Sequence, residues 1–191
     1  MKYQLFILFI CLNLASCAIT GKKHHYTGTK HNNKGAIRIV GSAVTPVENS
    51  GIIYGNIQSN SQLKNVEIYK LLANGKVDPN NHFRVRTFSN GNFIVENLLP
   101  GNYIISSVET KNNFLGLYAT EREMEFYSIQ VRQAEAVYAG TYKIIITQHN
   151  DNINVMRSAY PNEKKILQHV SQVERDSIWY QSLKARMRIL I

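Results

Sequence analysis

Short apolar runs separated by turn residues occupy the chain from about Ser50 to Thr147. Apolar and polar side chains alternate in several runs, as in Phe83–Thr87, and this period is typical of a strand with one buried face. The pattern predicts strands at 51–57, 66–72, 83–87, 93–95, 103–108, 114–119, 124–131 and 136–147. Because no helical stretch separates them, we expect a mainly β fold, an antiparallel sandwich of seven or eight strands.

Two dipeptides mark turns between these strands. Asn90-Gly91 tolerates the positive φ angles of a type I′ hairpin turn. Pro100-Gly101 suits a type II turn, because proline fixes φ and glycine accepts the left-handed position. The side chains expected in the core beside these turns are Phe93, Val95, Tyr103 and Ile105.

After Tyr160 the hydrophobic period changes to that of a helix. Pro161 suits a first helical turn, and Asp176 and Ser177 are good N-cap residues, so two short helices with a break between them are predicted. Their apolar stripes are Ile166, Val170 and Val173, then Trp179, Leu183, Met187 and Leu190. We expect both stripes to pack on the sandwich as a C-terminal helical extension.

The N-terminus has the pattern of a secretory signal peptide, in which Lys2 and the apolar run Leu5–Leu12 precede small residues. This run forms about 12 Å of helix, too short to span a hydrocarbon core of about 30 Å. The next residues, Leu14, Ala15, Ser16 and Cys17, resemble the bacterial lipobox at all four positions. The resemblance implies that residues 1–16 are removed and that Cys17 becomes the lipidated first residue of a palmitate-bearing lipoprotein. An ordinary signal peptide that contains a cysteine is the alternative.

The residue after the lipobox is Ala18 rather than an aspartate. In Gram-negative lipoproteins this implies sorting to the outer membrane, facing the periplasm. Several acyl chains on one residue give stable anchoring, so we expect the membrane to be the first partner. The other cysteine, Cys11, leaves with the signal peptide, which excludes a disulfide framework, a thiolate metal site and a cysteine nucleophile in the mature chain.

One stretch of the predicted sandwich resembles a known family pattern. It runs through Gly51-x-Ile-x-Gly-x-Ile57, Leu63-x-Asn-Val-x-Ile68 and Asn90-Gly-Asn-Phe-x-Val-x-Asn-Leu-x-Pro-Gly-Asn-Tyr103. The pattern is similar to that of the carboxypeptidase regulatory-like, prealbumin-like β-sandwich modules. The resemblance covers about half of the chain and implies a prealbumin-like fold rather than an activity. The Tyr-Arg-Gly-Ser signature of the hydroxyisourate hydrolases, one branch of that fold, is absent.

These patterns divide the chain into four segments. Residues 1–16 are a lipoprotein signal peptide, 17–40 a lipidated flexible basic tether, 41–150 the β-sandwich domain and 151–191 the helical segment. The tether contains His24, His25 and His31, but imidazoles without a carboxylate, a thiol or a preformed geometry do not predict a metal site. We expect no metal and no cofactor.

The formal charge of +9, from 22 Lys+Arg against 13 Asp+Glu, is unevenly distributed. Residues 18–40 carry five basic side chains and no acid, residues 41–150 nine of each sign, and residues 151–191 seven basic and four acidic ones. The sandwich is therefore neutral and lies between two basic ends. A basic tether beside a lipid anchor suits an anionic membrane surface, or is simply solvated. A secreted protein is separated from the DNA inside the cell, so we expect no nucleic-acid partner.

The best catalytic candidate is the set Glu121, Glu123 and Glu125, whose carboxylates would project from one face of a strand. Paired carboxylates of this kind can serve hydrolysis of a glycosidic bond. The alternative is a solvated strand edge, where Arg122 and Lys143 neutralise the acids. No phosphate loop, HExxH or CxxC motif occurs. The remaining histidines are scattered, at His82, His149 and His169.

Three functional hypotheses follow from these observations. The leading one is a membrane-anchored envelope lipoprotein that acts as a non-catalytic binding or structural module for another envelope component. The second is a carbohydrate- or peptidoglycan-binding lipoprotein that uses exposed aromatic rings such as Tyr118, Tyr127 or Tyr138. The third is an envelope hydrolase that uses the three glutamates.

Overall fold

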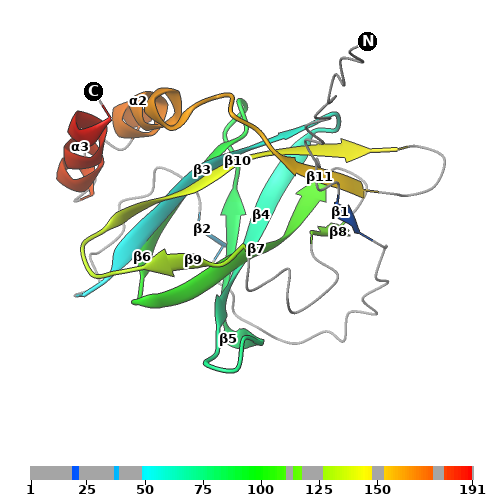
Figure 1. Ribbon diagram of the computed structural model, residues 1–191, viewed down its shortest axis with the longest axis horizontal. Coiled ribbons are helices and arrows are strands. Elements are labelled where there is room, and N and C mark those ends of the chain that lie inside the picture. The colour runs from blue at the N-terminus through cyan, green and yellow to red at the C-terminus, as the bar shows by residue number, and fades with distance from the viewer. Residues whose placement is uncertain are drawn as a thin grey trace, which may run out of the picture.

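A computed structural model describes residues 19–21, 37–38, 49–110, 114–117, 127–147, 153–173 and 179–190. These residues form two β-sheets packed face to face, followed by two helices, which confirms the predicted fold class (Figure 1). The first sheet has the strand order β1 (Ile19–Gly21), β11 (Ile153–Arg157), β10 (Ala136–Ile146), β3 (Gly51–Ser59) and β6 (Asn92–Leu98). The second has the order β2 (Ile37–Arg38), β5 (Val77–Arg86), β4 (Leu63–Leu71), β7 (Gly101–Thr110) and β8 (Phe114–Gly116), and β9 (Ile129–Val131) also pairs with β7.

Strands β3 to β10 fall on the predicted strands, whereas β1, β2 and β11 were not predicted. Ile19–Gly21 pairs with β11 and Ile37–Arg38 pairs with β5, so these two short pieces of the predicted tether belong to the sheets. The predicted signal peptide lies outside the described residues. Strand β1 begins at Ile19, two residues after Cys17 in the sequence.

The central pair of the first sheet, β3 and β10, is parallel, unlike the antiparallel pairing that the sequence predicts. The reason lies at the start of β10. Strand β9 belongs to the second sheet, and the turn that follows crosses to the first sheet beside the beginning of β3, where Ile52 N–H donates to Glu135 O at 2.9 Å and Ala134 N–H to Ser50 O at 2.8 Å. Because both strands begin at the same end of the sandwich, they run in the same direction.

One face of each sheet contributes to a core between the sheets. The predicted core residues Phe93, Val95, Tyr103 and Ile105 are all buried there, which confirms the prediction. Ile53 and Ile57 of β3 and Val66 and Ile68 of β4 complete its centre. Burying a side chain of this size stabilises the fold by about 1.5–3 kcal/mol.

Helices α2 (Glu163–Val173) and α3 (Tyr180–Ile189) cover the outer face of the first sheet, on the side away from the second sheet (Figure 1). Helix α2 begins after Asn162, whose Oδ1 accepts the Lys165 N–H at 3.1 Å and acts as the N-cap. Helix α3 has Trp179 at its N-cap position without a side-chain cap, and the predicted cap residues 176–177 lie outside the described residues. Six residues of the predicted stripes pack as expected on this face against Ile52, Tyr54, Ile94 and Ala136: Ile166, Val170, Trp179, Leu183, Met187 and Leu190. The side chain of the seventh, Val173, lies outside the described residues.

A polar contact fastens the two helices to the sheet. The Tyr54 hydroxyl on β3 donates to Glu163 Oε1 at 2.5 Å, and Arg186 on α3 donates to both carboxylate oxygens, at 2.7 Å from Nε and 3.3 Å from Nη2. Burial, followed by the hydrogen bond to Glu163, raises the pKa of Tyr54 far above its ordinary value. The same carboxylate raises the pKa of Arg186. Glu163 thus joins three elements that are distant in the sequence.

We predict that Glu163→Ala lowers the free energy of unfolding by about 2 kcal/mol, because it leaves the Tyr54 hydroxyl and the Arg186 guanidinium without their acceptor. Urea denaturation followed by circular dichroism measures the change. The neighbouring Lys164→Ala alters an exposed side chain and should stay within about 0.5 kcal/mol of wild type. Equal effects of the two substitutions would contradict the role assigned to Glu163.

A second prediction concerns alkaline pH. Burial raises the pKa of Tyr103, whose hydroxyl donates to Leu99 O at 2.6 Å, from 10.0 to about 12. The folded chain therefore holds this proton more tightly than the unfolded chain, so its stabilising contribution is complete below pH 10 and is lost as the pH rises toward 12. Tyr103→Phe has no proton to lose, and its unfolding free energy should fall less steeply than that of wild type above pH 10. Tyr160→Phe, which changes an exposed ring, is the control and should keep the wild-type slope.

Candidate functional site

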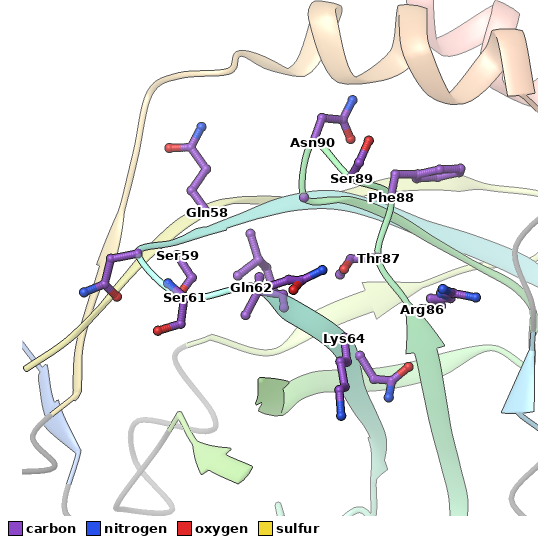
Figure 2. Close-up of a pocket in the computed structure, with 15 residues that line it drawn as sticks. Gln58, Ser59, Ser61, Gln62, Lys64, Arg86, Thr87, Phe88, Ser89 and Asn90 are labelled. Carbon is purple, nitrogen blue, oxygen red and sulfur yellow. The ribbon is translucent and has the colours of Figure 1, made fainter. Parts of the chain in front are cut away.

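A groove with a volume of about 1180 Å³ lies at one end of the sandwich (Figure 2). Two connections that pass from one sheet to the other form it, β3–β4 and β5–β6. Figure 2 shows Gln62 of the first connection and Thr87 of the second facing one another. The lining consists of residues 57–65 and 86–91, and most of these side chains carry amides or hydroxyls.

The β3–β4 wall is held by Asn60, whose side-chain amide makes the two backbone hydrogen bonds that a neighbouring strand would make. Asn60 Nδ2 donates to Ile146 O at 2.9 Å, and Asn60 Oδ1 accepts the Ile146 N–H at 3.0 Å, so this amide pairs with the last residue of β10. The Ser61 N–H donates to Ser59 Oγ at 3.1 Å and closes the turn. The wall is thereby anchored to the parallel strand pair at the centre of the first sheet.

The β5–β6 wall is a tight turn pressed against β3. Gly91 N–H donates to Phe88 O at 2.9 Å, and Gly91 O accepts the Ile57 N–H at 2.9 Å. Gly91 has φ +80°, and a Cβ there would lie 2.2 Å from Ile57 O. Asn90 does not have a positive φ, and the strands on either side lie in different sheets, so the type I′ hairpin predicted for Asn90-Gly91 is wrong. The glycine is required by its close approach to β3 rather than by a hairpin.

Buried asparagines support this turn from behind. Asn56 Nδ2 donates to Asn90 O at 2.9 Å and to Asn92 Oδ1 at 2.7 Å, while Asn90 Oδ1 accepts the Asn92 N–H at 3.1 Å. Asn56 and Asn92 are buried on neighbouring strands. A buried network of amides fixes its members in one geometry, since a broken hydrogen bond there leaves a desolvated polar group. The groove is therefore preorganised on both sides.

Several side chains that line the groove remain available to a ligand. Five of them form no hydrogen bond and no salt bridge within the part of the chain that the structure describes, and all are exposed or half-exposed: Gln58, Gln62, Lys64, Arg86 and Ser89. The lining contains two cations and no carboxylate. Its four hydroxyl side chains have no histidine or carboxylate beside them in the lining that could act as a base.

A second polar cluster lies on the outer face of the second sheet. Glu67 Oε2 accepts the Ser107 hydroxyl at 3.2 Å and lies 3.4 Å from His82 Nε2. The carboxylate lies between the serine and the histidine, whereas activation of a serine nucleophile requires the base to contact the hydroxyl. Next to it, Glu109 binds Arg84 and accepts Asn65 Nδ2 at 2.6 Å. Burial alone would raise the pKa of Glu109, but these hydrogen bonds outweigh it and the pKa is lowered. We interpret the cluster as cross-strand stabilisation.

The structure describes only some of the predicted site residues. Tyr138 is half-buried, stacks on Tyr54 with ring centroids 5.7 Å apart and hydrogen-bonds Thr141 at 2.8 Å. Tyr127 packs against the core, with the Arg157 guanidinium 5.2 Å from its ring centroid. Both rings are half-buried and make internal contacts, whereas the sequence suggested exposed rings. The following predicted residues lie outside the described residues: Leu14, Ala15, Ser16, Cys17, His24, His25, His31, Tyr118, Glu121, Glu123, Glu125 and His149.

The two described candidate histidines lie apart. His82 stacks on Tyr69 of β4, with ring centroids 4.4 Å apart, and His169 of α2 meets the edge of Phe88 at 5.1 Å. Among the described residues no group of three or more histidines, cysteines and acids is arranged to hold a metal ion. Neither described helix is long and apolar enough to cross a membrane. The sequence missed the groove because its residues come from two unconnected turns without a motif.

We predict that Gly91→Ala destabilises the protein by about 3 kcal/mol, the sum of left-handed strain and the clash with Ile57 O. Gly75 offers a matched control, because it has nearly the same φ, +78°, but nothing lies within 4 Å of its added Cβ. Gly75→Ala should therefore cost only about 1 kcal/mol. Urea denaturation of both variants gives the two values, and equal losses would show that the contact with β3 is unimportant.

Comparisons with known proteins are sparse. No protein-family model matches the sequence, and no curated protein matches it. Among solved structures, the crystal structure of BcpA, the major pilin subunit of Bacillus cereus, matches over 50% of this chain with 17% sequence identity and a TM-score of 0.29. The match spans 29% of the pilin subunit's own chain. A likeness at this level assigns neither a family nor a function.

Proposed function

We propose that the protein is a non-catalytic binding module of the cell envelope, held at a membrane by lipid on Cys17. The observation that carries the binding role is the groove at the end of the sandwich, where polar side chains without internal partners sit on a rigid frame. Binding sites are commonly built in this way, on connections positioned by packed strands. The lining also lacks a catalytic pair, which favours binding over hydrolysis.

The proposed anchor rests on the sequence of residues 14–17, which resembles a lipobox. Strand β1 begins at Ile19 and pairs with β11 at Val155, so no more than about 7 Å of extended chain separates Cys17 from the edge of the first sheet. A lipid on Cys17 would hold this edge close to the headgroups. Lys22 and Lys23 follow β1 directly in the sequence, and a basic residue near an anionic membrane surface contributes about 1 kcal/mol of attraction.

We predict that the protein incorporates labelled palmitate in its native host and sediments with membranes. Cys17→Ser should abolish the labelling, because the thiol that accepts the lipid is gone. Cys11→Ser is the matched control and should be labelled like wild type, since Cys11 lies in the predicted signal peptide. Labelling that persists in Cys17→Ser, or that disappears in Cys11→Ser, would falsify the anchor.

A further inference from the structure

We propose that the groove binds a carboxylate-bearing polysaccharide. This inference rests on the proposed binding function and names the class of ligand for the same site. Three properties of the groove lead to it: its size, its hydrogen-bonding side chains and its charge.

The size of the groove favours a chain over a single small molecule. Pockets for small molecules have volumes of about 300–1,000 Å³, and the groove, at about 1180 Å³, exceeds that range. It lies between two turns at one end of the sandwich (Figure 2). Several linked residues of a polymer therefore fit better than one monomer.

The polar side chains match hydroxyl groups. The lining contains five amide and four hydroxyl side chains, and Gln58, Gln62 and Ser89 are among those without an internal partner. An amide offers both donors and an acceptor, and a sugar hydroxyl also both donates and accepts. The apolar side chains of the lining are Ile57, which is buried, Leu63 and Phe88.

The charge of the groove favours an acidic ligand. Lys64 and Arg86 are both exposed, and the lining contains no carboxylate to neutralise them. The neighbouring acid, Glu109, binds Arg84 and Asn65 and also interacts electrostatically with Lys64, so Arg86 is the cation of the lining without an acid partner among the described residues. An arginine fork pairs with a carboxylate through two parallel hydrogen bonds, and a lysine adds a compact charge.

The test uses the full-length protein in detergent and fluorescently labelled oligogalacturonate, which carries one carboxylate on each sugar. We expect saturable binding that weakens as salt is raised, and at least about tenfold weaker binding to the same oligomer with methyl-esterified carboxylates. The double substitution Lys64→Gln/Arg86→Gln should weaken binding by about tenfold or more. Gln62→Ala, which leaves the charge unchanged, should also weaken it.

The control is Lys76→Gln/Arg132→Gln, which removes the same charge from exposed side chains at the opposite end of the sandwich and should bind like wild type. Circular dichroism checks that every variant is folded. Equal loss in the control, absence of binding to oligogalacturonate, or equal binding of poly-L-glutamate would overturn the proposal, the last by showing a site for acidic peptides. None of these results affects palmitate labelling of Cys17, so failure of the ligand class is distinguishable from failure of the anchor.

Discussion

Strand β3 is covered on both faces, and the rest of the structure depends on this double burial. Its first seven residues are buried, with Ile53 and Ile57 turned to the core between the sheets and Ile52 and Tyr54 turned to the helices. Without α2 and α3, the outer face of the first sheet would expose an apolar surface around a buried phenol. The C-terminal segment is therefore a required layer of the fold, and Glu163 satisfies the one polar atom of Tyr54 that this layer covers.

The groove inherits its rigidity from the same strand. The end of β3 leads directly into the β3–β4 wall, while Gly91 of the other wall is bonded to Ile57. The parallel partner β10 extends to Ile146, where Asn60 completes the pairing. A site supported by a central strand loses little conformational entropy when it binds a ligand, which suits the recognition of weakly held groups such as hydroxyls. Core packing and the groove are thus linked through one element.

The sequence predicted the parts of the fold that local pattern controls. Alternation and helical period located β3 to β10 and the apolar stripes on both helices, because burial of one face imposes these periods directly. Pairing between distant segments has no such signature, so the parallel β3–β10 pair was not predicted. Strand β11 was missed because the alternation of Ile153, Asn154 and Val155 covers only three residues before Met156 breaks it. The groove was missed for a related reason: the buried asparagines at its back, Asn56 and Asn92, are poor strand formers whose hydrogen bonds with one another appear only in three dimensions.

The charge of the groove shows why the net charge of a segment does not predict the local charge at one place on its surface. Residues 41–150 carry equal numbers of acids and bases, yet they form a groove lined by two cations and no acid. Three of the acids that the structure describes are bound by other groups. Glu67 and Glu109 are bound to neighbouring strands on the outer face of the second sheet, and hydrogen bonds from Asn81 and Asn80 hold the pKa of Asp78 below its ordinary value. A neutral sandwich can therefore attract an anion at one end, because opposite charges that are held apart by strands do not cancel locally.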